Sequence, residues 1–261
     1  MLKLNLDTDK INRCHELAQS ITSKVNQELV PYGTVAIERT VTRFMGVDGV
    51  DEEGVPLPNV FVNELANRGK VNDGAALYLA NACVELGMTP QQICEMVAAR
   101  SLDITNLPWH GADVVRAKAR ELCEESLALV KANRKKRESM LEDMPVTETP
   151  WLYVICATGN ALEDAVQAKM AAAQGADVIA VIRSTGQSLL DYVPHGITTE
   201  GFGGTYATRE NFKLMRAALD EESEKLGRYV RLVNYCSGLC MPEIAFMGAV
   251  ERLDMMLNDA M

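Results

Sequence analysis

The spacing of hydrophobic and polar positions changes once along the chain. Up to about residue 138, apolar residues recur every three or four positions, which is typical of amphipathic helices. Thr89-Pro90 is typical of a helix start, and glycines at positions 46, 69 and 87 are typical of helix ends. The pattern predicts helices over residues 8–30, 34–45, 59–68, 72–87, 90–100 and 111–138.

A polar segment with prolines, residues 139–150, separates this half from a second half with another pattern. There, short and fully apolar runs alternate with helical patterns. We expect strands over residues 151–156, 177–182 and 229–235, and helices over residues 160–174, 208–226 and 242 to about 258. Strands of this kind, alternating with helices, predict a parallel sheet of the α/β class. Three such units are too few to close a barrel, so we expect the chain to be a part of a longer subunit.

Composition narrows the classes of protein that fit the chain. With 261 residues and 48% apolar positions, the chain is large enough to bury a core. A net charge of −10 argues against nucleic-acid binding. No apolar run has membrane-spanning length, and the N-terminus lacks the apolar core of a signal peptide. The seven scattered cysteines favour reduced thiols. These features predict a cytoplasmic protein with neither a nucleic-acid nor a membrane partner.

Candidate chemistry lies directly after the predicted strands. Residues 158–160, 183–188 and 234–238 are rich in hydroxyls, amides and glycine, and Arg183 adds a fixed cation. In parallel α/β folds the carboxyl ends of the strands meet at one edge, where ligands bind. Such residues suit a phosphorylated cofactor. The alternative is that they are only hydrophilic turns.

A long glycine-rich loop, residues 191–205, is a candidate lid over this edge, and His195 within it is a candidate for proton transfer or an exposed loop histidine. The glycines at its end do not have dinucleotide-binding spacing. Cys236 and Cys240 open an iron–sulfur triad whose third position is Glu243, so a cluster lacks a ligand. The acidic loop over residues 48–58 lacks calcium-loop spacing and is interpreted as a solvated turn. No metal site is predicted.

Several of these segments resemble one family. Residues 181–194 and 200–208 are similar to the α-subunit family of lysine 5,6-aminomutases, as are residues 234–245, 251–254 and 256–260. In the helical half, residues 55–59 and 74–78 resemble the same family. The similarity runs through the whole chain in order, which identifies the chain as the N-terminal part of such a subunit.

The resemblance implies a fold and a set of cofactors. It implies that residues 1–145 form an all-helical accessory region and that residues 146–261 form the first β-α units of a TIM-type (β/α)8 barrel. It further implies pyridoxal 5′-phosphate at the carboxyl face of the barrel, and a β subunit that binds adenosylcobalamin and carries the lysine of the internal aldimine. No catalytic residue is therefore assigned to this chain, and two α and two β subunits are expected to assemble.

The resemblance also implies site residues and a reaction. The cofactor-binding positions are Arg183, Ser184, Thr185, Gly186, Gln187, Ser188 and Ser237. The reaction is a radical migration of the terminal amino group of D-lysine or L-β-lysine, which gives 2,5- or 3,5-diaminohexanoate in lysine degradation. Two alternatives stay open: a component of an ornithine 4,5-aminomutase, or a non-catalytic module that assembles with a cobalamin-binding subunit.

Overall fold

The computed structural model describes residues 7–144, 147–158, 160–181, 204–236 and 241–257. Its first half is helical, as the sequence predicts. Phe61, Leu65, Leu79 and Ile93 are fully buried in its core. The helices are α1 (Thr8–Phe44), α2 (Leu57–Asn67), α3 (Ala75–Leu86), α4 (Pro90–Ala98) and α5 (Ala112–Asp143), with 3-10 turns at Val71–Asp73 and Ile104–Asn106.

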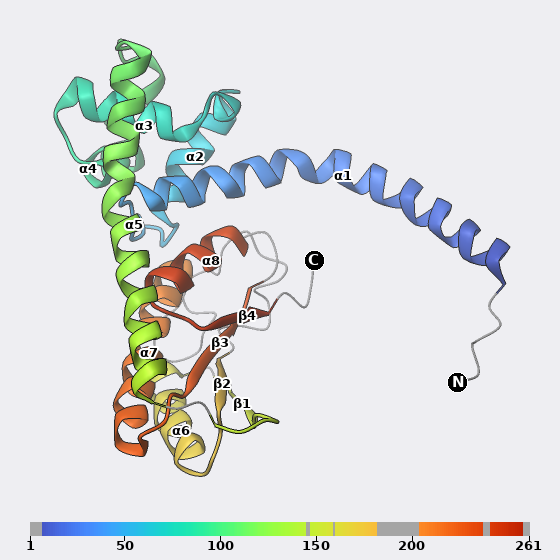
Figure 1. The fold of residues 1–261 in the computed structure, drawn as a ribbon. Coiled ribbons are helices and arrows are strands. Elements are labelled where there is room, and N and C mark those ends of the chain that lie inside the picture. The colour runs from blue at the N-terminus through green and yellow to red at the C-terminus, as the bar shows by residue number, and fades with distance from the viewer. Residues whose placement is uncertain (1–6, 145–146, 159, 182–203, 237–240, 258–261) are drawn as a thin grey trace.

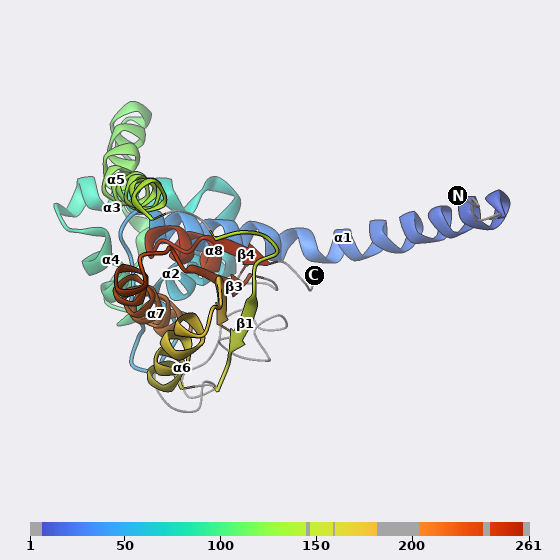
Figure 2. The same ribbon diagram turned by 60° about the horizontal axis from the view of Figure 1, so that its bottom comes forward.

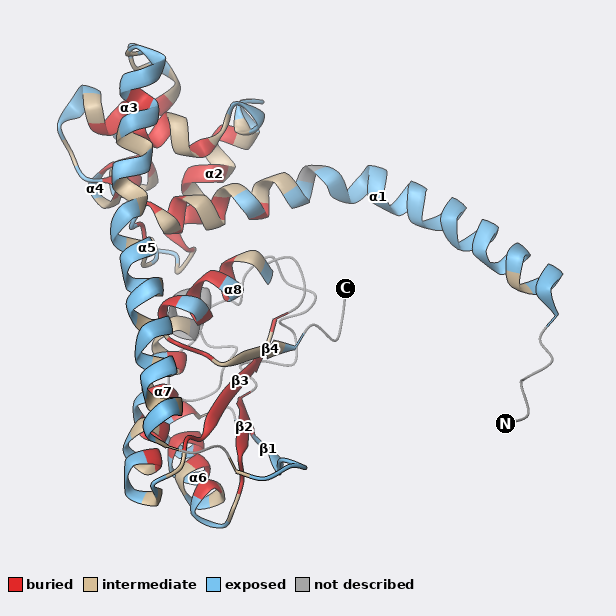
Figure 3. Ribbon diagram, in the orientation of Figure 1, coloured by how far each residue is buried: buried red, intermediate tan, exposed pale blue. Residues whose placement is uncertain are grey.

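Helix α1 is one continuous helix, so the predicted break between residues 30 and 34 is wrong. Proline removes one backbone donor, and that loss is most costly where water cannot reach the unpaired carbonyl. Here Gln27, the residue four positions before Pro31, is exposed, so its carbonyl can be hydrated. The N-terminal part of α1 projects from the body as an exposed arm (Figures 1 and 3).

Helix α5 connects the two halves. It starts among the other helices and runs along α7 and α8 (Figure 1), ending at Asp143 rather than at the predicted residue 138. Asn133 Nδ2 donates a hydrogen bond to the Val250 carbonyl at 2.5 Å, and Lys136 pairs with Asp220 at 3.4 Å. The helical half is thus packed directly on the second half. Within the described residues, no helix is both long and apolar enough to cross a membrane.

The second half is a parallel sheet whose strand order follows the sequence. Each described strand pairs with the next in parallel, and a helix follows each of the first three. The strands are β1 (Tyr153–Cys156), β2 (Val178–Val181), β3 (Arg231–Tyr235) and β4 (Met255–Leu257), and the helices are α6 (Ala161–Ala173), α7 (Gly204–Leu226) and α8 (Met241–Val250).

Strand β4 was not predicted. The sequence pattern extended α8 to about residue 258, but α8 ends at Val250 and the chain turns at Arg252, whose φ is 59°. Residues 255–257 then pair with β3. A short apolar run is compatible with both a helix and a buried strand, so periodicity alone cannot separate them.

The three following helices cover one face of the sheet (Figures 1 and 2). Ile179 and Leu232 point into the core that these helices form, which also contains Phe212 and Ile244. The alternate residues Val178, Ala180 and Val233 form a small cluster on the opposite face. A doubly wound sheet carries helices on both faces, whereas sequential strand order with helices on one face is the arrangement of a β/α barrel.

Candidate functional site

The carboxyl ends of the strands form an edge at which the following helices begin. β1 ends at Cys156 and α6 starts at Ala161, and β3 ends at Tyr235 before α8 starts at Met241. β2 ends at Val181, and α7 begins at Gly204, four residues before its predicted start. Helix N-termini present unpaired backbone N–H groups and a partial positive charge, so this edge favours an anion.

The loop after β1 is fixed by local hydrogen bonds. Asn160 caps α6, because its side chain accepts from the backbone of Leu162 at 3.0 Å. Asp164, buried in the first turn of α6, accepts from the backbone N–H and the hydroxyl of Thr158, both at 2.8 Å. Thr158 and Asn160 were predicted as candidate ligand groups, and the structure shows them ordering the loop. The role of Asp164 was not predicted.

The cofactor-binding positions that the resemblance implies are outside the described residues. They follow directly from described strand ends, because Val181 is two residues before Arg183 and Tyr235 is two residues before Ser237. The candidate lid, apart from the start of α7, is also outside them. The residues concerned are Arg183, Ser184, Thr185, Gly186, Gln187, Ser188, His195 and Ser237.

The described end of β3 contains one amide and one thiol. Asn234 is fully buried, and its Nδ2 donates to the Tyr235 carbonyl at 2.8 Å, while its Oδ1 has no hydrogen-bond partner among the residues that the structure describes. Cys236 is buried, with Sγ 3.2 Å from the Met241 carbonyl, so this thiol packs against the start of α8. Among the described residues, no group of His, Cys, Asp or Glu side chains is arranged to hold a metal ion.

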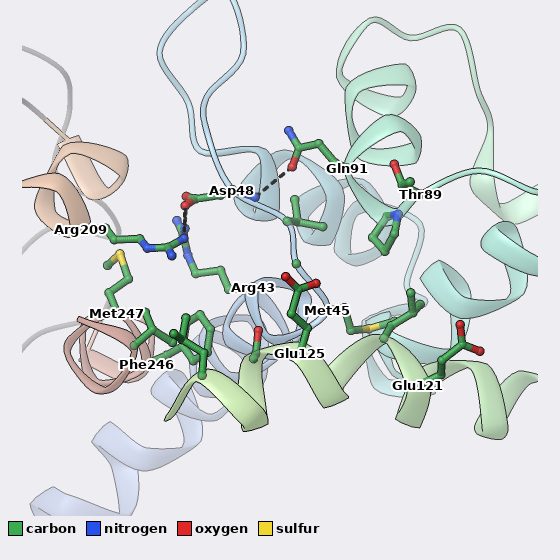
Figure 4. A pocket seen from close by; sticks show the side chains of 17 residues that line it. Arg43, Met45, Asp48, Thr89, Gln91, Glu121, Glu125, Arg209, Phe246 and Met247 are labelled. Atoms are coloured by element: carbon green, nitrogen blue, oxygen red, sulfur yellow. Dashed lines mark hydrogen bonds and ion pairs between the residues drawn. The ribbon is translucent and has the colours of Figure 1, made fainter. Parts of the chain in front are cut away.

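An ion-pair chain ties the helical half to α7 and α8 near this edge. Arg43 at the end of α1 donates from Nε to Glu243 in the first turn of α8 at 2.8 Å, and from Nη1 to Asp48 at 3.2 Å. Asp48 also accepts from Arg209 of α7 at 2.7 Å, and Arg209 in turn pairs with Glu251 at 2.7 Å. Figure 4 shows Arg43, Asp48 and Arg209 beside a cavity of about 520 Å³.

These ion pairs correct one interpretation from the sequence. Asp48 was expected to lie in a solvated turn, but it is partly buried between two arginines, and its backbone N–H donates to Gln91 at 3.0 Å. Burial by itself lowers the pKa of Arg209, yet the bonds to Glu251 and Asp48 outweigh it and raise that pKa above the ordinary value. The sequence pattern did not predict these ion pairs, because Arg43 and Glu243 are 200 positions apart.

The described edge is compatible with a bound phosphate. The carboxylates in the first turns of α6 and α8 would repel an anion if they were free. Asp164 is bonded to Thr158 and Glu243 to Arg43, whereas Glu163, also in the first turn of α6, is exposed to solvent. The backbone N–H groups at the starts of α6, α7 and α8 are the groups at this edge that suit a phosphate.

The fold and this edge define part of a β/α barrel, a fold in which ligands bind at the carboxyl ends of the strands. A model of the TIM-barrel domain of the D-lysine 5,6-aminomutase α subunit matches residues 4–261, and the chain belongs to this family. The resemblance and the barrel fold expected from it are confirmed.

Individual relatives agree with the family assignment. The chain is 53% identical over 259 residues to the lysine 5,6-aminomutase α subunit of Acetoanaerobium sticklandii, covering 99% of this chain and 50% of the relative. It is also 53% identical over 262 residues to the lysine 5,6-aminomutase α subunit of Fusobacterium nucleatum, covering 100% of this chain and 51% of that relative. The chain thus spans about half the length of these relatives. The D-ornithine 4,5-aminomutase subunit β of A. sticklandii is 38% identical over 112 residues, which is 43% of this chain and 15% of that relative.

Proposed function

We propose that the chain is the part of a lysine 5,6-aminomutase α subunit that binds pyridoxal phosphate. The reaction is an isomerisation that moves the terminal amino group of D-lysine or L-β-lysine to the neighbouring carbon, giving 2,5- or 3,5-diaminohexanoate. The observation that carries this proposal is the 53% identity along essentially the whole chain, through both the helical half and the barrel half.

In this proposal the residues after β2 and β3 hold the cofactor. Ser188 binds the phosphate, Ser237 bonds to the pyridine nitrogen, and Arg183 lies toward the phenolic oxygen. Residues 184–187 complete the proposed cofactor-binding segment after β2. When bound, pyridoxal phosphate supplies the conjugated system that stabilises an unpaired electron next to the migrating amine.

The described residues of this chain position that site. Asp164 fixes the loop after β1 through Thr158, and Arg43 fixes the first turn of α8 through Glu243. The segments that carry the proposed cofactor residues lead into α7 and α8, and the ion pairs of Arg209 and Glu243 fix the early turns of these two helices.

A β subunit is the proposed partner, in an assembly of two α and two β subunits. It binds adenosylcobalamin and supplies the lysine that holds the pyridoxal aldehyde. The comparison with the ornithine enzyme favours the lysine enzyme, because the ornithine relative matches less than half of this chain while the lysine relatives match all of it.

The test is a binding and turnover experiment on a subunit of family length. The chain is extended by the part of the F. nucleatum relative that it does not match, and is co-expressed with a cobalamin-binding β subunit. We expect saturable pyridoxal phosphate binding by visible absorbance, weakened by Ser188→Ala and by Ser237→Ala, and conversion of D-lysine or L-β-lysine. A folded complex that binds no pyridoxal phosphate would contradict the proposal and leave the chain a structural role.

A further inference from the structure

Arg231 of β3 lies on the face of the sheet that points away from the helices. Side chains alternate along a strand, and Val233, two positions further on, belongs to the apolar cluster on that face. The parallel register places Arg231 beside Val178 of β2, at the amino end of the strands and opposite the proposed cofactor edge. In a closed β/α barrel this face is the interior, which packed side chains fill. Arg231 therefore places a cation in the core of the barrel.

The guanidinium of Arg231 reaches across β2 toward β1. It stacks on the ring of Trp151, two residues before β1, with Cζ 3.8 Å from the ring centroid. The indole is itself held, because Trp151 Nε1 donates to the Thr147 carbonyl at 3.2 Å. The ring attracts a cation over its face but has no oxygen or nitrogen that accepts a hydrogen bond. Stacking thus fixes the guanidinium and leaves its N–H groups available for an acceptor.

Arg231 has no ion-pair partner within the part of the chain that the structure describes. The residue is only 9% exposed, and its Nη1 is buried there without a hydrogen-bond partner. Asp177 is near enough for Arg231 to help lower its pKa, but its ion pair is with Arg228. Arginine is almost never buried unless it is paired, because an uncompensated charge in a protein core is strongly destabilising. The described strands therefore supply the cation of a buried pair and lack its anion.

We propose that Arg231 pairs with the carboxylate of an Asp or Glu on one of the last two strands of the complete barrel. The guanidinium lies beside the start of β1, which neighbours the last strand once a barrel closes. Side chains from alternate strands share a level of the interior, which adds the strand before the last. A packed interior leaves no room for a solvent anion, and a planar guanidinium matches a carboxylate.

The length of the chain leaves room for this partner. The chain spans about half the length of its relatives, and the described strands are four of the eight in such a barrel. The proposed pair joins the two halves of the barrel at the end opposite the cofactor edge. It goes beyond the proposed function, because it depends on the barrel fold and not on the cofactor.

The experiment measures melting temperatures of the family-length complex with its β subunit. We expect Arg231→Met to lower the melting temperature by about 5 °C or more, because the carboxylate is left buried and unpaired. Arg231→Lys, which keeps the charge but not the planar fork, should lower it less. Each Asp and Glu on the last two strands is then replaced singly by its amide, with and without Arg231→Met. One amide variant should reproduce the loss alone and add little to that of Arg231→Met.

Arg228→Met is the matched control, because its partner Asp177 lies in the described part of the chain. Its loss should add to that of every amide variant on the last two strands. If Arg231→Met does not fold, the same comparison is made with Arg231→Lys. An unchanged melting temperature for Arg231→Met would overturn the proposal. So would a loss that adds to that of every amide variant, because the effect would then come from packing on Trp151.

Discussion

At the scale of single residues, Asp177 shows how one buried carboxylate fixes a junction. It precedes β2, accepts from the Leu152 backbone N–H at 2.9 Å and from the Thr147 hydroxyl, and pairs with Arg228 at 3.3 Å. Burial alone raises its pKa, but these hydrogen bonds and the nearby arginines outweigh burial and lower the pKa below the ordinary value. Asp177 thus holds the segment before β1 against the start of β2.

This lowered pKa gives a pH prediction. A carboxylate whose folded-state pKa is below its unfolded value stabilises the fold above the unfolded value, and that contribution is lost as pH falls through the folded pKa. We expect Asp177→Asn to reduce the free energy of unfolding by about 1–3 kcal/mol at pH 7. The difference should shrink below about pH 4. Urea denaturation of the variant and the unsubstituted chain, at pH 7 and below about pH 4, measures this difference. A difference that does not change with pH would contradict the argument.

Buried thiols give a second prediction at this scale. Burial raises the pKa of Cys83 to about 11 and that of Cys94 well above its ordinary value, so both stay protonated at pH 8. The thiolate is the reactive form. We expect iodoacetamide to modify the exposed Cys14 while Cys83 and Cys94 are protected until urea unfolds the chain. Peptide mass spectrometry reads this out, and modification of all three at equal rates would show that the helical core is not packed as described.

At the scale of elements, the tie between α1 and α8 is the contact with the largest expected effect. The Arg43 and Glu243 side chains are 2% and 0% exposed. Removing one partner of a buried pair leaves the other charge without compensation, which costs about 3–5 kcal/mol. We expect this loss of unfolding free energy for Arg43→Met, with partial recovery in the double variant Arg43→Met/Glu243→Leu.

An exposed pair provides the control for that prediction. Arg134 and Glu138 in α5 are bonded at 2.8 Å, but their side chains are 73% and 50% exposed. Exposed pairs contribute about 0–1 kcal/mol, so Arg134→Met should change the unfolding free energy little. Chemical denaturation of Arg43→Met and Arg134→Met measures the two losses of unfolding free energy. Equal losses would mean that the Arg43–Glu243 contact is not buried.

The sequence predicted elements where the signal is local. Thr89 caps the start of α4 before Pro90 and Gly87 ends α3, as the sequence predicts. The sequence pattern did not predict structure that depends on residues far away along the chain. The short strand β4 is stabilised by pairing with β3, a partner that a local pattern does not contain. The ion pairs of Asp48 were not predicted for the same reason.

At the scale of the whole molecule, one side of the barrel half is exposed in this chain taken alone. Leu162, Val166 and Met170 form an apolar stripe along α6, and they are 58%, 60% and 58% exposed. Tyr153 and Ile155 of the neighbouring strand β1 are 42% and 48% exposed. In a closed β/α barrel the first strand and its helix pack against the last unit. This side is therefore where we expect the remainder of the barrel to pack.

An exposed strand edge with an apolar stripe favours association between copies. We expect the 261-residue chain to self-associate in light scattering after size exclusion, and Val166→Lys to reduce the apparent mass. Leu127→Lys, which adds the same charge on an exposed position of α5, should leave it unchanged. A monomeric chain that Val166→Lys does not alter would show that this side needs no covering partner.

The central claim is that the edge after β2 and β3 is the cofactor face of an aminomutase barrel. Hydrogen–deuterium exchange of the family-length complex with its β subunit, with and without pyridoxal phosphate, tests the location directly. The account predicts that the cofactor protects backbone amides around residues 183–188 and 235–238, with no change in α2 and α4. Protection confined to the helical half, or none in these two segments at saturating cofactor, would contradict it.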